Sequence, residues 1–181
     1  MLLDTPTADL GWKAQPFTLS DADGKSYSLS DLQGKNGLLI AFICNHCPYV
    51  QAIADRLVAD AKTLQNEGIN VVAISSNDYS YVPADSPPMM KKFAARHGFS
   101  FPYLIDEDQS VGQAYGAVCT PDFFGFNADG ELQYRGRLDD VRMGNPANRK
   151  TELVDAMRQI AMTGHGPDVQ NASIGCSIKW R

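Results

Sequence analysis

Two short apolar runs, separated by one amphipathic stretch of helix length, constrain the fold of this chain more than any other feature. The runs cover residues 37–43 and 69–75, and each has the length of a strand and the composition of one covered on both faces. Between them, apolar residues recur every three or four positions, which predicts a helix over about residues 47–67. A strand, a helix and a second strand in this order make the two strands parallel, with a right-handed crossover. The chain is therefore expected to have an α/β fold.

Weaker signals predict the remaining elements. Residues 17–19 and 26–29 flank an Asp-Gly turn and predict an N-terminal β-hairpin, and residues 122–126 and 132–135 predict a second hairpin in the same way. The other predicted elements are a helical turn at 30–32, a loop at 77–88, a strand at 101–105, and helices at about 89–97, 109–115 and 153–161. A length of 181 residues suits one domain. We therefore expect a single domain over residues 1–181, with a central mixed β-sheet flanked by helices, an N-terminal β-hairpin, a central insertion and residues 164–181 as a C-terminal tail.

Composition and charge exclude several classes of function. Lys and Arg total 16 against 21 Asp and Glu, a net charge of −5, so we expect no nucleic-acid partner. The longest apolar run, residues 38–44, is too short to span a membrane, so we expect no membrane association. The first residues have neither the basic nor the apolar region of a signal peptide, which predicts a cytoplasmic location. Arg135, Arg137, Asp139 and Asp140 could form a site, but a solvated, charged strand end is favoured. Tyr79, Tyr81 and Asp85 lie on a long loop that could shape a substrate groove, although a loop of this composition needs no function.

The four cysteines are too few for a disulfide-stapled scaffold, and two of them form the motif Cys44-Asn45-His46-Cys47 at the junction of the first predicted strand and helix. Unpaired N–H groups and the dipole at a helix N-terminus stabilise a thiolate and lower its pKa. We predict that Cys44 attacks a disulfide as the thiolate and that Cys47 resolves the mixed disulfide. A positive charge on His46 would stabilise the thiolate further and favour the reduced form of the pair.

Three other interpretations of the motif have less support. A closed zinc site needs four ligands, and Cys119, Cys176, His97 and His165 are scattered, so no metal or cofactor is expected. Covalent haem attachment needs His directly after the second cysteine, where Pro48 stands. Two inert core cysteines would suit an apolar environment, but their place at a strand-to-helix junction counts against this interpretation.

A second signal is Cys119-Thr120-Pro121, which directly precedes the second predicted hairpin. In this chain order with Cys44 and Cys47, it makes the sequence resemble the thioredoxin superfamily. The resemblance implies a thioredoxin-like fold, a cis peptide bond before Pro121 opposite the cysteine pair, and binding of the substrate at Thr120 and Pro121. For Pro121 taken alone, the alternative is a proline that simply begins a strand.

Longer stretches narrow the resemblance to the AhpC/TSA and TlpA-like redoxins. Residues 16–21 and 29–35 look like the opening of these proteins, and the similarity covers most of the chain. Two positions depart from thioredoxin itself: Ile43 replaces the Trp before the first cysteine, and Leu38 replaces a buried carboxylate that assists proton transfer. Proton transfer therefore falls to water, His46 or another group.

The sequence thus favours a thiol-disulfide oxidoreductase that acts on a protein or small-molecule disulfide and is reduced by a thiol reductant. Cys47-Pro48 also resembles the surroundings of the peroxide-attacking cysteine of peroxiredoxins. The alternative is therefore a thiol peroxidase with antioxidant activity, in which Cys47 or Cys44 attacks the peroxide. Peroxiredoxins carry Thr three residues before that cysteine, where this chain has Cys44, which suits dithiol exchange better. A second alternative is a redox-sensing or binding module without catalysis.

The remaining cysteines, Cys119 and Cys176, are candidate accessory redox residues. Cys119 lies two residues before Pro121 and should be near Cys44. Cys176 could reach the same region and form a second disulfide, as a regulatory or relay partner. The alternative is that both are buried apolar residues, as free cysteines commonly are.

Overall fold

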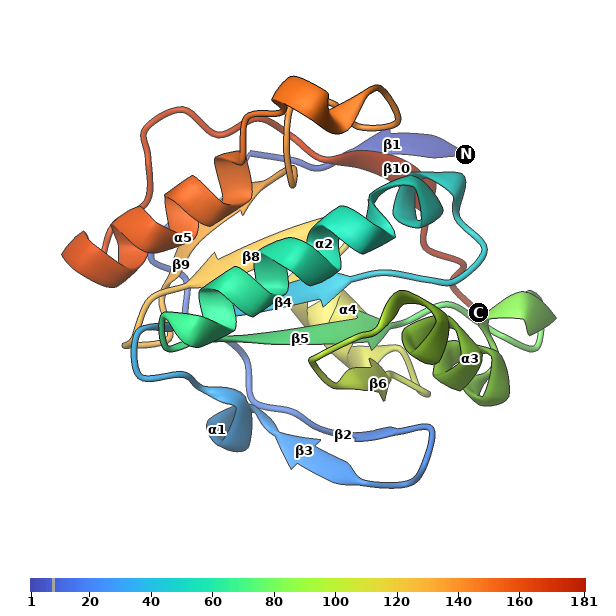
Figure 1. The fold of residues 1–181 in the computed structure, drawn as a ribbon. Coiled ribbons are helices and arrows are strands. Elements are labelled where there is room, and N and C mark those ends of the chain that lie inside the picture. The colour runs from blue at the N-terminus through green and yellow to red at the C-terminus, as the bar shows by residue number, and fades with distance from the viewer. Residues whose placement is uncertain (8) are drawn as a thin grey trace.

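The computed structural model describes residues 1–7 and 9–181, and a seven-stranded sheet forms its centre (Figure 1). Its strands are, in spatial order, Ser26–Ser28 (β3), Thr18–Asp21 (β2), Tyr103–Ile105 (β6), Ile69–Ser75 (β5), Gly37–Phe42 (β4), Asp122–Phe126 (β8) and Leu132–Gly136 (β9). β4, β5 and β6 run parallel, whereas the pairs β3–β2, β2–β6, β4–β8 and β8–β9 are antiparallel. The predicted mixed sheet is confirmed, and the N-terminal hairpin forms one of its edges.

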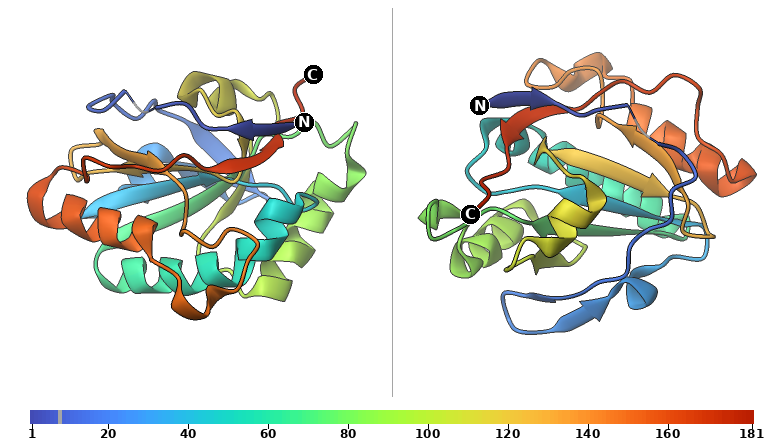
Figure 2. Two further views of the ribbon diagram at one scale, coloured as in Figure 1. Left: turned by 90° about the horizontal axis from the view of Figure 1, so that it is seen from above. Right: turned by 180° about the vertical axis from the view of Figure 1, so that it is seen from behind.

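Helices cover both faces of this sheet. They are Leu29–Leu32 (α1), Pro48–Asn66 (α2), Pro87–His97 (α3), Ser110–Tyr115 (α4) and Glu152–Thr163 (α5), with short 3₁₀ turns at Pro83–Asp85 (η1) and Pro146–Asn148 (η2). Figure 1 shows α2 and α5 in front of the sheet and α4 behind it, and the rear view in Figure 2 brings α4 to the front. Compared with the thickness of a bilayer, none of the helices in the described residues has both the length and the apolar character to cross it.

The apolar run of β4 divides its side chains between two cores. Its odd-numbered residues, continued by Ile43, pack with α2, α3 and α5, whereas its even-numbered residues pack with α4 and the N-terminal segment. All six residues from Leu38 to Ile43 are fully buried. Because successive side chains of a strand point to opposite faces, a strand covered on both sides needs an apolar residue at every position.

A second, three-stranded sheet joins both chain ends to the middle of the chain. Its strands, in spatial order, are Leu2–Asp4 (β1), Ile174–Ser177 (β10) and Cys119–Thr120 (β7), and both pairs are antiparallel. The two views of Figure 2 show β1 and β10 side by side. The sequence analysis predicts neither β1 nor β10, so the segment 164–181 contains an ordered strand in addition to its loops. Strands this short carry no local hydrophobic pattern, and their pairing joins residues as distant as Leu2 and Cys176.

Arg135 and Asp122 form a buried ion pair on the neighbouring strands β9 and β8. The Nη2 atom of Arg135 lies 2.9 Å from Oδ2 of Asp122, and the two side chains are 8% and 0% exposed. The guanidinium also donates to the carbonyl of Gly116 and lies over the ring of Phe124, 4.5 Å from its centroid. The prediction of a solvated strand end is therefore wrong for Arg135, because a carboxylate and an aromatic ring replace water around its charge.

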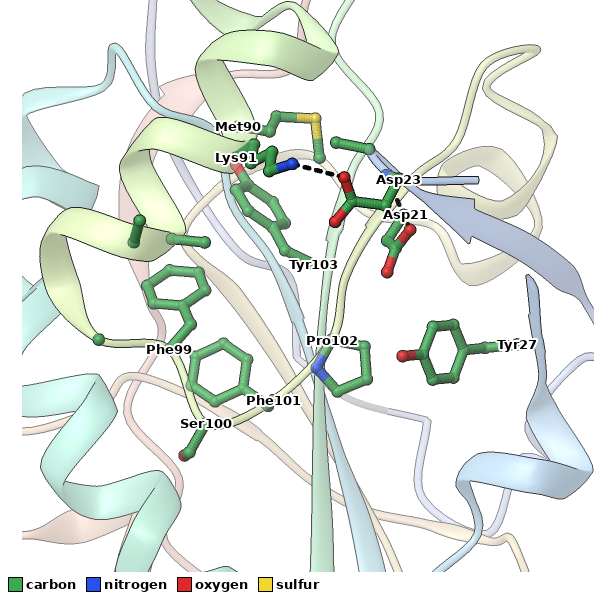
Figure 3. Close-up of a pocket in the computed structure, with 14 residues that line it drawn as sticks. Asp21, Asp23, Tyr27, Met90, Lys91, Phe99, Ser100, Phe101, Pro102 and Tyr103 are labelled. Carbon is green, nitrogen blue, oxygen red and sulfur yellow. Dashed lines mark hydrogen bonds and ion pairs between the residues drawn. The ribbon is translucent and has the colours of Figure 1, made fainter. Parts of the chain in front are cut away.

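A groove of about 490 Å³ lies between α3 and the β2–β3 hairpin (Figure 3). Lys91 of α3 and Asp23 of the hairpin turn form an ion pair of 2.6 Å in its wall, to which Phe101 and Tyr103 also contribute. Among the described residues, its lining includes no cysteine, so the groove is distinct from the cysteine motif.

Candidate functional site

The cysteine motif lies at the predicted strand-to-helix junction. Cys44 comes shortly after the end of β4, and Cys47 is the N-cap of α2, with Pro48 as the first helical residue. Pro48 suits this position because it lacks the N–H group that would have no partner there, and the other free N–H groups of the first turn lie beside the N-cap. Both cysteines are 0% exposed, so their sulfur atoms lie beneath the surface.

Thr120 contacts both sulfur atoms from the opposite side. The Sγ atom of Cys44 lies 3.2 Å from the hydroxyl Oγ1 of Thr120, and the Sγ atom of Cys47 lies 3.3 Å from the Thr120 carbonyl oxygen. The peptide bond between Thr120 and Pro121 is cis, as the family resemblance implies. The structure therefore brings together four predicted site residues, Cys44, Cys47, Thr120 and Pro121.

A hydrogen bond between the two thiols makes them unequal. Donation from Cys44 is the largest of the effects that lower the pKa of Cys47, despite its burial. The thiol and amide of Cys176 and the amide of Val50 lower it further. The same thiol–thiol hydrogen bond raises the pKa of Cys44, together with burial and the negative charge of Asp85. These effects favour the thiolate at Cys47, because thiol and helix N–H donors converge on its sulfur, whereas the sequence analysis expects Cys44 to attack. The order of attack stays a prediction.

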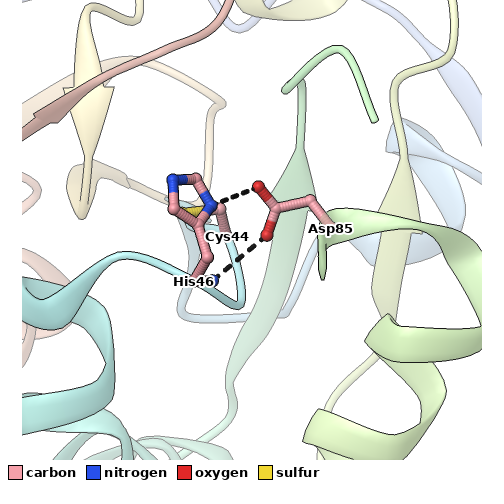
Figure 4. A group of neighbouring side chains, drawn as sticks. All are labelled: Cys44, His46 and Asp85. Carbon is pink, nitrogen blue, oxygen red and sulfur yellow. Dashed lines mark hydrogen bonds and ion pairs between the residues drawn. The ribbon is translucent and has the colours of Figure 1, made fainter. Parts of the chain in front are cut away.

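His46 pairs with a buried carboxylate that the sequence analysis did not place at the site. Its Nδ1 lies 2.5 Å from Oδ2 of Asp85, and the side chains of His46 and Asp85 are 29% and 0% exposed (Figure 4). Asp85 also accepts the backbone N–H groups of Asn45 and His46 and the side-chain amide of Asn77. One carboxylate thus fixes both the backbone of the motif and the imidazole ring. The second ring nitrogen of His46 points away from Asp85 in Figure 4.

Cys44, His46 and Asp85 also have donor atoms of the kind that bind metal ions, all within 4.8 Å of one another. Three donors are one fewer than a closed structural zinc site needs, and the carboxylate oxygens of Asp85 already accept hydrogen bonds from four donor groups. The arrangement therefore fits a hydrogen-bonded anchor better than a metal site. The expectation that the protein binds no metal stays a prediction.

Asn45, the second residue of the motif, forms hydrogen bonds with three other segments. Its side-chain amide donates to the carbonyl of Ala84 at 3.0 Å and accepts from the hydroxyl of Tyr103 at 2.9 Å. Its own carbonyl accepts from the side chain of Gln51 in α2 at 2.9 Å. These contacts hold the loop between the cysteines in one conformation, so the positions of the two sulfur atoms are fixed by residues from three other segments.

The two remaining cysteines are placed differently from one another. Cys176 of β10 faces Thr120 in the antiparallel register and packs against the core cluster that contains Cys44 and Cys47. Cys119 precedes Thr120, and its thiol points to the carbonyl of Pro121 at 3.7 Å. Burial is the largest of the effects on the Cys119 thiol and raises its pKa. Neighbouring strand residues point to opposite faces, so the Cys119 side chain points away from the face on which Thr120 meets Cys44, whereas Cys176 lies on that face. A redox role for either cysteine stays a prediction.

A model of the AhpC/TSA family matches residues 10–135 of the chain. The thiol-disulfide oxidoreductase ResA of Halalkalibacterium halodurans is 28% identical over 129 residues, which cover 71% of this chain and 69% of that protein. The peroxiredoxin Bcp of Escherichia coli is 29% identical over 117 residues, covering 65% of this chain and 70% of that protein.

Two solved structures extend the comparison. An uncharacterized conserved protein from Geobacillus kaustophilus is 41% identical and superimposes with a TM-score of 0.94, over 100% of this chain and 97% of that one. The thioredoxin domain of a thiol-disulfide oxidoreductase from Bacteroides vulgatus is 16% identical, with a TM-score of 0.66 over 86% of this chain and 99% of that domain. The second match shows that the fold is thioredoxin-like.

Proposed function

This chain belongs to the AhpC/TSA family, and from the geometry of its cysteine pair we propose that it is a thiol-disulfide oxidoreductase. The observation that carries the proposal is the position of Cys44 and Cys47 at a helix N-terminus, where both sulfur atoms contact Thr120 beside the cis peptide bond to Pro121. Two neighbouring cysteines, one to attack and one to resolve the mixed disulfide, are the arrangement that dithiol exchange requires. Membership of a family of redoxins and the similarity to ResA support the same chemistry.

In the proposed reaction Cys47 is the nucleophile of the pair. A disulfide is reduced when the Cys47 thiolate bonds to one of its sulfur atoms, and the other sulfur leaves and takes up a proton from solvent. Cys44 then gives up its proton and bonds to Cys47, and the second substrate sulfur takes up a proton and leaves as a thiol. The substrate gains two electrons and two protons, one of them from solvent, and the protein is left with a Cys44–Cys47 disulfide. Two thiol groups of an external reductant then reduce this disulfide by the same exchange and are themselves oxidised to a disulfide.

The proton of Cys44 needs an acceptor, since Leu38 stands where thioredoxins carry a buried carboxylate. We assign this role to His46, which has one ring nitrogen held by Asp85 and is partly exposed. Donor atoms of Cys44 and His46 lie within 4.8 Å of one another, so one water or a small side-chain movement completes the transfer. Asp85 acts through His46 as a positioning residue.

Two measurements on the reduced protein test the proposal. We expect catalysis of insulin disulfide reduction by dithiothreitol, and peptide mapping after oxidation by glutathione disulfide should show a Cys44–Cys47 link. The proposal is wrong if neither turnover nor this link is found. A link without turnover would instead support the redox-sensing module.

A thiol peroxidase is the second candidate, and one observation favours it. The Cys47 thiolate is the N-cap directly before Pro48, and the peroxiredoxin Bcp is among the similar proteins. In this reaction the Cys47 thiolate bonds to one peroxide oxygen and forms a sulfenic acid, and the other oxygen leaves as hydroxide, which takes up a proton to form water. Cys44 then condenses with the sulfenic acid to a disulfide and a second water. A stopped-flow measurement decides between the candidates: consumption of hydrogen peroxide far faster than by free thiols, without reduction of insulin, would favour the peroxidase. The cytoplasmic location stays a prediction for either candidate.

A further inference from the structure

The C-terminal strand β10 pairs with the segment to which the family resemblance assigns substrate binding, at Thr120 and Pro121. Residues Cys176 and Ser177 of β10 pair with Thr120 and Cys119 of β7, directly before the cis peptide. The approach is close, since a Cβ atom added to Gly175 would collide with the carbonyl group of Thr120. An external strand therefore cannot pair with Thr120 while β10 is in place, and the chain's own segment stands where a substrate strand is expected.

The register places the Cys176 side chain on the same face as the redox pair. Residues directly opposite one another in an antiparallel pair have their side chains on one face, roughly 5 Å apart at Cβ. Thr120 is opposite Cys176, and its hydroxyl lies 3.2 Å from the sulfur of Cys44. The Thr120 carbonyl lies 3.3 Å from the sulfur of Cys47. Cys176 thus packs against the core cluster that contains both cysteines.

Exposure separates Cys176 from the other three cysteines. Cys44, Cys47 and Cys119 are each 0% exposed, whereas Cys176 is only partly buried. An external disulfide that meets the folded protein therefore reaches Cys176 before it reaches either member of the buried pair. Helix α2 and strand β10 are in contact, so Cys176 of β10 has a short route to Cys47 at the N-terminus of α2.

We propose that Cys176 is a third redox cysteine, which exchanges with external disulfides at the surface and passes the oxidation inward to Cys47. This inference rests on the proposed function and names Cys176 as the residue through which external disulfides react with the buried pair. The recognised substrate class is a small or flexible disulfide that can approach a thiol on β10, as opposed to an extended strand that must pair with Thr120.

The exchange balances in three steps. Burial, together with the hydrogen bond to Cys47, raises the pKa of Cys176 to about 11, so Cys176 passes its proton to the Cys47 thiolate as it bonds to one sulfur of the external disulfide. The other external sulfur leaves and takes up a proton from solvent. Cys47 then bonds to Cys176, giving a Cys47–Cys176 disulfide, and its proton goes to the second external sulfur, which leaves as a thiol. Finally Cys44 loses its proton and bonds to Cys47, and Cys176 leaves, takes up a proton and is again a thiol. The external disulfide has gained two electrons, and the protein holds the Cys44–Cys47 disulfide.

The first experiment stops the exchange reaction at its second step. The C44S variant lacks the last nucleophile, so treatment with glutathione disulfide should leave a Cys47–Cys176 disulfide as the main product in peptide mapping. Glutathione that stays bound to Cys47 while Cys176 remains a free thiol would overturn the proposal. The double variant C44S/C176S serves as the control, in which the Cys47–Cys176 product cannot form.

The second experiment measures how much Cys176 contributes to the rate at which the buried pair reacts. Reduction of glutathione disulfide by the reduced C176S variant should be slower than by the wild type by at least about tenfold, because only molecules with a displaced β10 expose the pair. S177A alters the same strand next to Cys176 and should keep the wild-type rate. If C176S keeps the wild-type rate or exceeds it, β10 is only a cover and the proposal fails. In that case formation of the Cys44–Cys47 disulfide would still support the oxidoreductase, so the two conclusions fail separately.

Discussion

The carboxylate of Asp85 holds the imidazole of His46 at 2.5 Å, across 39 residues of sequence. Its other oxygen accepts the N–H groups of Asn45 and His46, so the turn η1 fixes the backbone and the ring of the cysteine motif together. An imidazole with one nitrogen bound to a carboxylate has a defined tautomer and orientation, which leaves the second nitrogen to exchange protons. Asp85 and His46 thus form a unit in which the buried acid orients the exposed base.

Replacing Asp85 by Asn should slow dithiol exchange by about tenfold to hundredfold, because the ring loses the anion that orients it. A second variant separates this role from the loss of the backbone anchor. H46A keeps the bonds from the N–H groups of Asn45 and His46 to Asp85, so it should slow exchange by a similar factor if the imidazole takes up the proton. The exposed D23N, in the β2–β3 turn, should leave the rate unchanged. A wild-type rate in H46A would show that protons leave Cys44 by another route.

The two cysteines of the motif should behave differently as serine variants. With a nucleophilic Cys47, C44S should accumulate a disulfide at Cys47, whereas C47S should lose exchange by the pair. Mass spectrometry after reaction with glutathione disulfide measures both. Accumulation of a Cys44 mixed disulfide in C47S, with little product in C44S, would restore the sequence-based order of attack.

The lowered pKa of Cys47 should appear as a weak dependence of its alkylation rate on pH. An ordinary thiol, with a pKa of about 8.5, loses most of its thiolate between about pH 8 and about pH 6, and its rate falls with it. A pKa below this window leaves the Cys47 thiolate populated throughout, so its relative rate should stay nearly constant. Because donation from Cys176 contributes to the shift, C176A should make the rate fall more steeply toward acid pH. The relative profile is the quantity to compare, since burial lowers every rate by a common factor. Equal profiles for Cys47 and free cysteine would contradict the thiolate assignment.

Breaking the buried Arg135–Asp122 pair should be strongly destabilising. R135M leaves the buried Asp122 carboxylate without its partner and should lower the free energy of unfolding by about 3–5 kcal/mol, measured by urea denaturation. Burial raises the pKa of Asp122 even with Arg135 present, so the variant can recover by binding a proton. Because the pKa of Asp122 is higher in the folded than in the unfolded protein, protonated Asp122 favours the folded state, and this contribution is lost as pH rises through the folded-state pKa. The loss of unfolding free energy in R135M should therefore be smaller at about pH 5 than at about pH 8.

The double variant D122N/R135M controls for the loss of packing. It removes the unpaired charge as well as the guanidinium, and should be more stable than R135M alone at about pH 8. A deficit equal to that of R135M would assign the effect to packing around Phe124 instead of to the charge.

Gly175 offers a test of β10 that leaves every cysteine in place. G175V adds a side chain against the Thr120 carbonyl and should displace β10 from β7, since backbone and not a flexible side chain stands in the way. Cys47 should then react with maleimide faster than in the wild type, while the far-ultraviolet circular dichroism of the main sheet stays unchanged. Unchanged reactivity would mean that β10 does not limit access to Cys47.

The sequence predicts the centre of this fold well because its signals are local. The six residues of β4 and the helix after Cys47 are each defined by their own apolar pattern, and Pro48 marks the start of α2. The position of the cysteine motif follows from these two elements alone. The cis peptide before Pro121 came from the family resemblance, since the dipeptide itself does not determine its isomer.

The parts that sequence could not supply depend on contacts between distant segments. Asp85 looks like any acidic loop residue until η1 packs on the motif, and Arg135 looks solvated until Asp122 lies beside it. β1 and β10 have three and four residues and become strands through pairing with one another. The choice between Cys44 and Cys47 as the thiolate depends on which sulfur receives hydrogen bonds, including one from Cys176, and this is a property of the assembled site.

The pairing of β1 with β10 has a practical consequence for work with the recombinant protein. The Met1 carbonyl accepts the N–H of Ser177, and the backbone N–H of Arg181 donates to the side chain of Gln109. An affinity tag attached at residue 1 or at residue 181 therefore starts within a few residues of the strand that carries Cys176. Redox measurements should be made after tag removal, or with tags compared at both ends, because a tag that loosens either terminus would alter the reactivity attributed to the active site.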